Sequence, residues 1–218
     1  MTTATGEELR KLVRQTFPKC TNVPLTLNCR NTRNIGEATA LLSGFASPPY
    51  RLGQVSGVDV DYFYYPTAGD QCALLAEVLR NLLLDHVKAS DIVILSPLTH
   101  SKSGVAALDG GGAFRILEIG ESAAAVRIPV IRFATIHAFK GMESPVVILC
   151  DVATVVGNGP QSLLYVAMSR ARSHLTIIAH EQVKCSIDES RGIPKDREIL
   201  DPVNPRHLRH SEVLGRWI

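Results

Sequence analysis

A short polar stretch between two apolar runs places several chemically active side chains close together. In FATIHAFKGMESPVVILC, residues 133–150, a histidine, a lysine, a glycine and a glutamate fall within seven positions. Lysine and histidine can bind anions, glutamate accepts hydrogen bonds, and glycine lets the backbone come close to a ligand. An ordinary polar turn between two buried strands would look similar, so the stretch alone leaves both a turn and a site open.

A second segment, about twenty residues further on, ends in arginines. Four of its residues recur at i, i+3, i+4 and i+7: Leu163, Val166, Ala167 and Arg170. This spacing predicts a helix whose apolar face leads to Arg170 at its far end, whereas Arg172 is expected to point elsewhere. Taken alone, an arginine in this position is more often a helix-terminal charge or a side chain that reaches solvent.

Together the two segments resemble the second RecA-like domain of superfamily 1 helicases of the UvrD/Rep type. That family has a T-[IV]-H-x-x-K-G-x-E motif, a strand, and then Y-V-[AG]-x-[ST]-R-A-R, which here read TIHAFKGME (135–143) and YVAMSRAR (165–172). LNCRNTRNI (27–35) is similar to the family's L-x-x-N-Y-R-S-x-x-x-I pattern, with Cys29 in place of the tyrosine. The resemblance covers residues 20–182.

For the nucleotide, the resemblance implies two catalytic residues, Arg170 as the arginine finger and Arg30 as its partner on the γ-phosphate. Arginine suits this role because its planar fork binds phosphate oxygens bidentately and keeps its charge. A finger that offsets charge on the transferring phosphoryl group is worth roughly 10³–10⁵ in rate. Three cofactor-binding residues are also implied: Asn28, Gly141 at a helix start, and Glu143 on the ribose.

For DNA, the resemblance implies contacts from Thr135, His137 and Lys140 near the rim of the same cleft. One turn would then sense both the nucleotide and single-stranded DNA. His137 considered alone could instead be a structural histidine.

Half of an ATP site is absent from the sequence. It has no G-x-x-x-x-G-K-[ST] phosphate loop, and it lacks the acidic pair that would hold magnesium. In the family, a preceding N-terminal RecA-like ATPase domain supplies both. The resemblance therefore implies that ATP and Mg²⁺ bind only together with that partner domain, in the same chain or another. This chain alone is expected to be inactive.

The fold that must position these residues is predicted to be α/β, a RecA-like three-layer domain. Strand and helix patterns alternate, which favours a mostly parallel sheet with helices on both faces. Five runs are expected as central strands: TLN (26–28), IVIL (92–95), VIRFATI (130–136), VVILC (146–150) and LTIIA (175–179). Helices are expected over 35–45, 70–86 and 162–173. Because open sheets bind ligands at the carboxyl ends of their strands, the site is expected at that edge.

The expected organisation is an N-terminal extension (1–20), the RecA-like domain (20–182) and a C-terminal tail (183–218) that ends in a docking helix (208–218). Of the 218 residues, 45% are apolar and 20% charged, as in one ordinary soluble domain with extensions. The net charge of +2 is too small to indicate a nucleic-acid partner by itself.

The five cysteines are scattered without metal-ligand spacing, so they are interpreted as reduced thiols and no metal site is predicted. The sequence shows neither a signal peptide nor an apolar stretch of about 18 residues. We therefore expect no membrane partner and a cytoplasmic location, or a nuclear one in a eukaryote.

Two functions from different classes remain open. One is the motor half of an ATP-dependent DNA helicase or translocase. The other is a stand-alone RecA-like module that binds nucleic acid or a protein without turning over ATP. Arg30, Glu143 and Arg170 occurring together favour the motor, because a module without catalysis would not need all three. A RecD-type helicase is a further variant, although that group usually reads K-S-Q-G where this chain has FKGME.

Overall fold

The centre of the molecule is a six-stranded sheet in the order β3-β8-β7-β4-β6-β5. The computed structural model describes residues 6–18, 27–44, 51–53, 55–108 and 112–193. The strands of this sheet are β3 (Asp61–Tyr65), β4 (Ile92–Ser96), β5 (Arg115–Glu118), β6 (Val130–Thr135), β7 (Ser144–Val152) and β8 (Ala171–His180). All neighbouring strands are parallel, which confirms the predicted parallel sheet.

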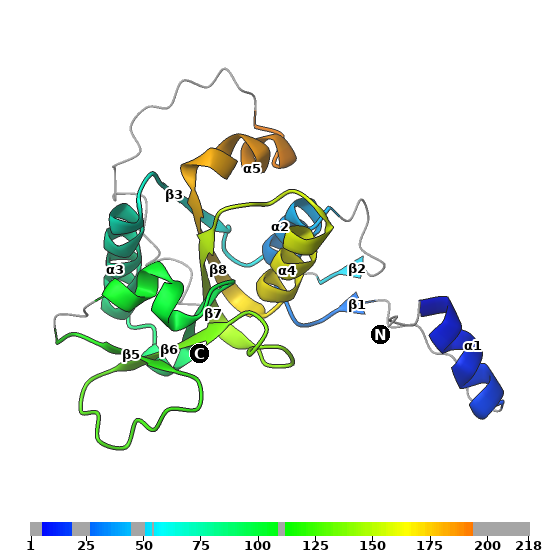
Figure 1. Ribbon diagram of the computed structural model, residues 1–218, viewed down its shortest axis with the longest axis horizontal. Helices are drawn as coiled ribbons and strands as arrows, with labels where there is room; N and C mark the ends of the chain where they lie inside the picture. Colours follow the sequence, from blue (N-terminus) through cyan, green and yellow to red (C-terminus); the bar gives the residue numbers. More distant parts are fainter. Residues whose placement is uncertain (1–5, 19–26, 45–50, 54, 109–111, 194–218) are drawn as a thin grey trace.

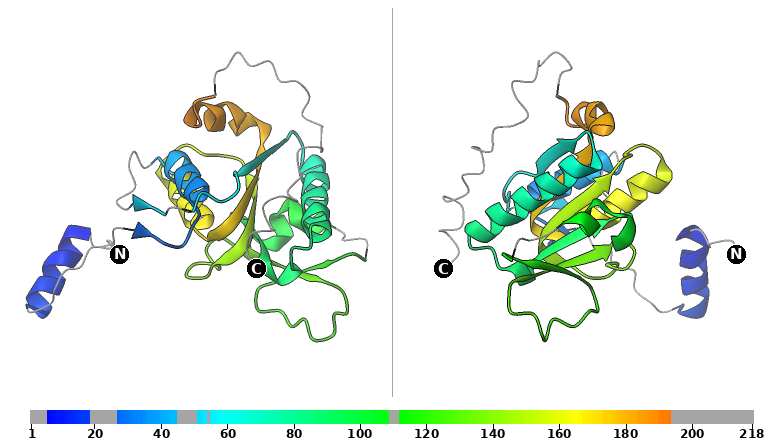
Figure 2. Two further views of the ribbon diagram at one scale, coloured as in Figure 1. Left: turned by 180° about the vertical axis from the view of Figure 1, so that it is seen from behind. Right: turned by 60° about the vertical axis from the view of Figure 1, so that its left-hand side comes forward.

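Helices cover both faces of the sheet. The α-helices of the described residues are α1 (Gly6–Thr16), which lies apart from the sheet (Figure 1), α2 (Arg33–Leu42), α3 (Ala68–Leu84), α4 (Asn158–Met168) and α5 (Lys184–Ser190). Figure 1 shows α3 on one face and α2 with α4 on the other, and the views in Figure 2 agree. Helix α3 begins slightly before the predicted residue 70, because the Thr67 hydroxyl caps it by accepting from the Asp70 N–H at 3.3 Å.

Burial on both faces explains the continuous apolar runs of the central strands. Successive side chains of a strand point to opposite faces, so a strand covered on both sides is apolar throughout. In β4, Ile92 and Ile94 belong to the core cluster that contains α3 residues. Val93 and Leu95 belong to the cluster with α2 and α4 residues. All four residues are at most 3% exposed.

One expected central strand is not part of this sheet. β1 (Leu27–Asn28) pairs only with β2 (Arg51–Leu52), in a separate two-stranded parallel sheet. The prediction for TLN is therefore wrong for its described residues, whereas Thr26 lies outside them. Leu27 is 54% exposed, so it lacks the burial of a central strand. After Asn28 the chain turns instead to contact the connection between α4 and β8.

The helix predicted over residues 162–173 ends early. α4 stops at Met168, and Ala171 already pairs with Ser144 as the first residue of β8. Leu164, Ala167 and Met168 are the buried residues of α4, so its inward face is slightly rotated from the predicted stripe. Pairing with β7 replaces the last predicted helical turn, because tertiary contacts override local helical spacing.

The packed domain continues past the expected boundary at residue 182. The 3-10 helix η4 (Glu181–Val183) and α5 add the buried side chains Val183 and Ile187 to the core. Beyond α5, the Arg191 guanidinium lies 4.2 Å from the Tyr62 ring centroid. The docking helix predicted at 208–218 lies outside the described residues. Figure 1 shows α1 apart from the sheet.

Shortening the buried Ile187 side chain tests whether α5 belongs to the folding unit. We expect Ile187→Val to lower the free energy of unfolding by about 1 kcal/mol, because it removes one buried methylene group. The measurement is urea denaturation of the whole chain. The control Ile119→Val, at a position that is 38% exposed, is expected to change stability by less than about 0.5 kcal/mol. Equal effects for both variants would contradict a core position for Ile187.

Candidate functional site

Charged residues from three separate segments meet at the amino-terminal edge of β7 and β8. Ser144 and Ala171 are paired first residues of these strands. Glu143 and Arg170 directly precede them. The expectation that the site lies at the carboxyl ends of the strands is therefore wrong. After β7, helix α4 leads the chain from the carboxyl edge of the sheet back to the amino edge, where β8 starts. The arginine motif at the end of α4 therefore lies at the amino edge.

Arg30, Glu143, Arg170 and Arg172 form what we call the amino-edge cluster. Arg30 Nε donates to Glu143 Oε2 at 3.1 Å, and Arg172 Nε lies 3.8 Å from Glu143 Oε1. The side chains of Arg30, Glu143 and Arg172 are each about half exposed. Two guanidinium groups pair with one carboxylate and a third, that of Arg170, lies near enough to interact with Arg30 and Glu143, so the cluster keeps a net positive charge that suits an anion.

Arg170 folds back onto the end of α4. Its guanidinium donates to Val166 O at 3.0 Å, to Ser169 Oγ at 3.0 Å and to Met142 O at 3.3 Å. Burial and then the positive charge of Arg30 lower the pKa of Arg170, opposed by Tyr165 and Glu143. Arginine nevertheless stays protonated in proteins, so Arg170 contributes a positive charge to the cluster.

The loop after β1 is shaped by two asparagines. Asn28 Oδ1 accepts from the N–H groups of Arg30 at 3.0 Å and Asn31 at 3.3 Å, and Asn28 Nδ2 donates to Asn31 Oδ1 at 3.0 Å. These bonds form an Asx-type turn. Asn28, predicted to bind a cofactor, thus has contacts that hold the loop carrying Arg30.

Asn31, which the sequence reasoning missed, joins this loop to the arginine motif. Its Nδ2 donates to Ser169 O at 3.2 Å and also to Ala171 O. The two accepting carbonyls flank Arg170, so Asn31 fixes the backbone around that residue. The sequence does contain a signal for Asn31: it follows Arg30 in the run N-C-R-N, and asparagine favours turns.

A cavity of about 580 Å³ opens beside the cluster, within the range typical of small-molecule sites, about 300–1,000 Å³. Its lining residues are Leu27, Asn28, Cys29, Arg30, Asn31, Glu143, Tyr165, Ser169 and Arg172. Arg172 was expected to point elsewhere but lines this cavity, whereas Arg170 is not among the lining residues. The cavity therefore presents Arg30 and Arg172 to a ligand.

Gly141 lies in a turn rather than at a helix start. Residues 136–141 form turns between β6 and β7, and Ser144 begins the next strand. The expected helix start is therefore wrong. Gly141 has φ +89°, a conformation that glycine adopts more readily than other residues. It is exposed and stands two positions before Glu143.

The residues predicted to bind DNA begin at the opposite edge of the sheet. Thr135 is the last residue of β6 and pairs with Ser96, the last residue of β4. His137 and Lys140 are exposed on the connection that follows. This connection crosses from the carboxyl edge to Glu143 at the amino edge, held by the buried side chain of Phe139. The two predicted sets therefore do not surround one cleft.

The carboxyl edge contains a carboxylate to which the sequence reasoning gave no role. Asp151 accepts hydrogen bonds from Gln71 and Ser96, each at 2.6 Å, from Ser103 and from the Gly104 N–H at 3.1 Å. Burial raises the pKa of Asp151, but these hydrogen bonds outweigh burial and lower the pKa below its ordinary value. Because Ser96 and Ser103 both donate to it, Asp151 fixes both ends of the intervening loop.

The backbone explains why Asp151 points into this network. Its φ is +57°, and the β7–β8 register shifts between Leu149 and Val152. Such bulges turn a side chain away from its regular direction. Aspartate is among the residues that tolerate positive φ best.

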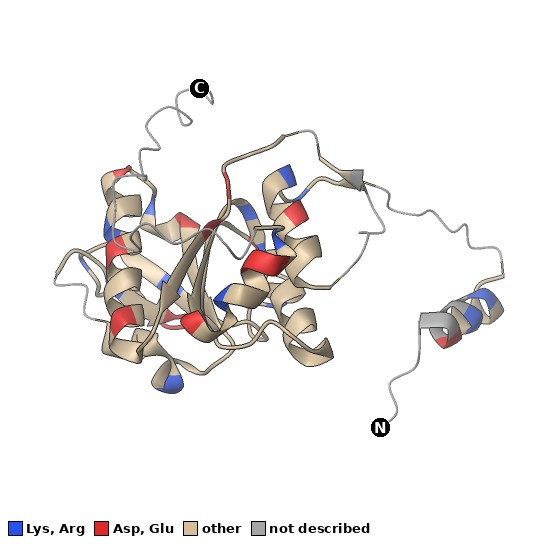
Figure 3. Cartoon of the chain, turned by 90° about the horizontal axis from the view of Figure 1, so that it is seen from above, with Lys and Arg blue, Asp and Glu red and all other residues tan. Residues whose placement is uncertain are grey.

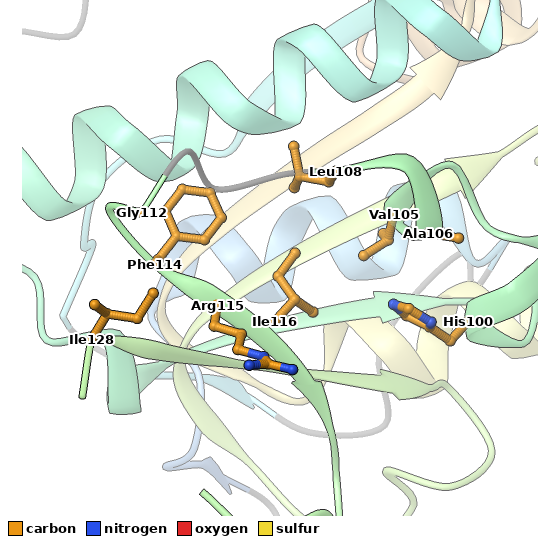
Figure 4. Close-up of a pocket in the computed structure, with 9 residues that line it drawn as sticks. All are labelled: His100, Val105, Ala106, Leu108, Gly112, Phe114, Arg115, Ile116 and Ile128. Carbon is orange, nitrogen blue, oxygen red and sulfur yellow. The ribbon is translucent and has the colours of Figure 1, made fainter. Parts of the chain in front are cut away.

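A second cavity, of about 350 Å³, lies beside the edge strand β5. Figure 4 shows that most of its lining residues are apolar, with His100, the first residue of η2 (His100–Lys102), and Arg115 on β5 as the basic ones. It contains none of the predicted site residues. Figure 3 shows basic and acidic residues interspersed over the elements, so the amino-edge cluster is a local feature.

Residues that could hold a metal ion are not grouped anywhere in the described part of the chain. In the same residues, no helix has the length and apolar character needed to cross a membrane. The cysteines placed by the structure, Cys29, Cys72, Cys150 and Cys185, are free thiols.

Comparison with known proteins confirms the resemblance to helicases. Residues 131–178 match the model of the UvrD-like helicase C-terminal domain. The matched segment runs from β6 into β8 and contains both motifs of the resemblance. It supports the interpretation of this chain as a helicase motor half. No curated protein matches the chain.

One of the solved structures that resemble this chain shares its fold. The C-terminal domain of a possible DNA helicase from Lactobacillus plantarum WCFS1 has a TM-score of 0.51 and 18% identity, over 69% of this chain and 86% of that chain. At this identity the likeness shows the fold alone, and it confirms the predicted RecA-like class. The C-terminal part of the Fun30 ATPase domain has a TM-score of 0.34 and 13% identity, over 63% of this chain and 49% of that chain. That score is too low to carry an argument.

Proposed function

We propose, starting from the match of residues 131–178 to a UvrD-like helicase C-terminal domain, that this chain is the C-terminal motor half of an ATP-dependent DNA helicase or translocase. Its partner is an N-terminal RecA-like ATPase domain, in the same chain or another. That domain supplies the phosphate loop and the magnesium ligands, and the amino-edge cluster faces it across the nucleotide.

The observation that carries this proposal is that Arg30 and Arg172 share the carboxylate of Glu143, and that Arg170 is close enough to interact electrostatically with Arg30 and Glu143. These residues come from three segments that are far apart in the sequence, and Arg30, Glu143 and Arg172 line a cavity large enough for a small ligand. Several arginines that share one acidic partner form a site for a strongly anionic ligand. A triphosphate satisfies that requirement.

Each residue of the cluster then has a chemical role. Bound ATP supplies the phosphoryl group that is transferred to water. Arg30 binds γ-phosphate oxygens, and Arg170 stabilises the negative charge that develops during transfer. Glu143 accepts a hydrogen bond from a ribose hydroxyl. Gly141 lies in the turn that precedes Glu143 and allows the backbone there to approach the nucleotide.

The segment from Thr135 to Glu143 supports coupling between DNA and the nucleotide. Single-stranded DNA binds Thr135, His137 and Lys140, whereas Glu143, at the other end, contacts the nucleotide. Phe139 anchors the segment in the core between these ends. A displacement at one end is therefore transmitted along a short, packed connection to the other.

The proposal predicts that the chain alone hydrolyses no ATP above background, even with single-stranded DNA, because it lacks the phosphate loop and the magnesium ligands. Adding or fusing the cognate ATPase domain should produce magnesium-dependent hydrolysis that DNA stimulates. Phosphate release is the measurement, and the ATPase domain alone is the control.

Two results would argue against this prediction. Magnesium-dependent turnover by the purified chain alone would show that the site is not divided between two domains. DNA binding without any hydrolysis in the assembled pair would favour the alternative, a RecA-like binding module without ATP turnover.

A further inference from the structure

Arg172 occupies a position that suits ligand binding. It is the second residue of β8, its side chain is 55% exposed, and it lines the cavity together with Arg30. The Arg170 guanidinium, in contrast, donates to Val166 O and Ser169 Oγ at the end of α4 and to Met142 O before β7, and it is not among the lining groups. Of the two motif arginines, Arg172 is thus the one presented to a bound molecule.

The backbone of Arg172 is tied to the loop that carries Arg30. The carbonyl of Arg172 accepts from the Thr32 N–H at 3.2 Å. The preceding carbonyl, of Ala171, accepts from Asn31 Nδ2. These two links hold the backbones of the two segments next to each other, and the Arg30 and Arg172 side chains line one cavity. Two guanidinium groups carried by adjacent segments can bind neighbouring oxygens of one ligand with less ordering of the backbone on binding.

The present partner of Arg172 is one that a ligand can replace. Its Nε lies 3.8 Å from Glu143 Oε1, which is longer than the 3.1 Å contact between Arg30 and Glu143. Both partners are about half exposed, and ion pairs of this kind contribute little to stability. A polyphosphate, with more charge and more acceptor oxygens than a carboxylate, would compete well for the Arg172 fork.

We infer that Arg172 is a second phosphate-binding residue of the cavity, which acts with Arg30 on the triphosphate of the bound nucleotide. This inference rests on the proposed function. It gives the two arginines of the motif different roles in ATP hydrolysis. Arg172 contributes to binding of the ground state, and Arg170 contributes to stabilisation of the transition state. Loss of the Arg172 side chain therefore raises KM, whereas loss of the Arg170 side chain lowers kcat.

Steady-state ATP hydrolysis by the assembled motor, with single-stranded DNA, tests this division. We expect Arg172→Ala to raise the KM for ATP about 10-fold with little change in kcat, because one charge-assisted contact is lost. Arg172→Lys should give a smaller increase, since lysine keeps the charge but not the fork. The matched control is Arg33→Ala, because Arg33 Nε donates to Gly53 O and its side chain does not line the cavity.

The outcomes separate this inference from the proposed function. An unchanged KM in Arg172→Ala, with turnover lost in Arg170→Ala, overturns the inference and leaves the motor proposal in place. If the wild-type assembled motor hydrolyses no ATP, the proposed function itself is wrong. Circular dichroism checks folding, and if Arg172→Ala fails to fold, a KM unchanged in Arg172→Lys overturns the inference.

Discussion

Replacing Arg170 by alanine is expected to lower DNA-stimulated ATP hydrolysis by the assembled motor about 10³-fold or more. The reason is electrostatic, because a guanidinium beside the transferring phosphoryl group offsets charge that is larger in the transition state than in the ground state. The loss should therefore appear in kcat rather than in KM. Single-turnover hydrolysis measures it directly.

Because Arg170 also makes structural hydrogen bonds, this experiment needs a control for stability. Arg170 also holds the end of α4 through Val166 O and joins it to Met142 O, so the variant loses some stability. Unfolding curves and DNA affinity must accordingly be compared with those of the wild type. The control Arg115→Ala removes an exposed arginine on β5, outside the amino-edge cluster. Near-normal turnover in Arg170→Ala would remove the catalytic assignment and favour the binding module.

Replacing Asp151 by alanine is expected to lower the free energy of unfolding by about 3 kcal/mol, since hydrogen bonds to a charged group are worth about 1.5–3 kcal/mol and a positive φ costs alanine about 1–2 kcal/mol. Gln71, Ser96 and Ser103 would lose a shared acceptor, and both ends of the intervening loop would be released. Urea denaturation measures the loss. A stability equal to the wild type would show that the network contributes nothing.

Asp151 should also make stability depend on pH. Its pKa in the folded chain is lowered, so the ionised carboxylate stabilises the fold above the pKa of the unfolded chain. This contribution is lost as the pH falls through the folded-state pKa. Wild-type stability should thus decrease on acidification more steeply than that of Asp151→Asn, which cannot titrate. The control Asp85→Asn, at the exposed end of α3, should retain the wild-type slope.

The sequence alone determined the fold class and most of the central strands. Runs such as IVIL and VVILC are apolar at every position because both faces of β4 and β7 are buried, and such a pattern indicates a covered parallel strand. The motifs also identified Arg30 and Glu143, which form an ion pair across 113 positions. These two residues were singled out by the resemblance of their motifs to those of the helicase family.

The tertiary structure decided at which edge of the sheet the site residues lie and with which strand β1 pairs, which sequence periodicity does not determine. The same residues would fit either edge of a sheet, and only the return of the chain through α4 places Arg170 and Arg172 at the amino edge. Leu27 and Asn28 have a strand-like sequence, yet they pair with β2 outside the main sheet.

The structure also gives roles to two residues that the motifs did not single out. Asn31 and Asp151 act through partners that are distant in sequence, Ala171 in one case and Gln71 in the other. The physical reason is that hydrogen bonds between remote segments depend on how the elements pack. A local pattern reports which face of an element is apolar, but not which polar group will lie opposite it.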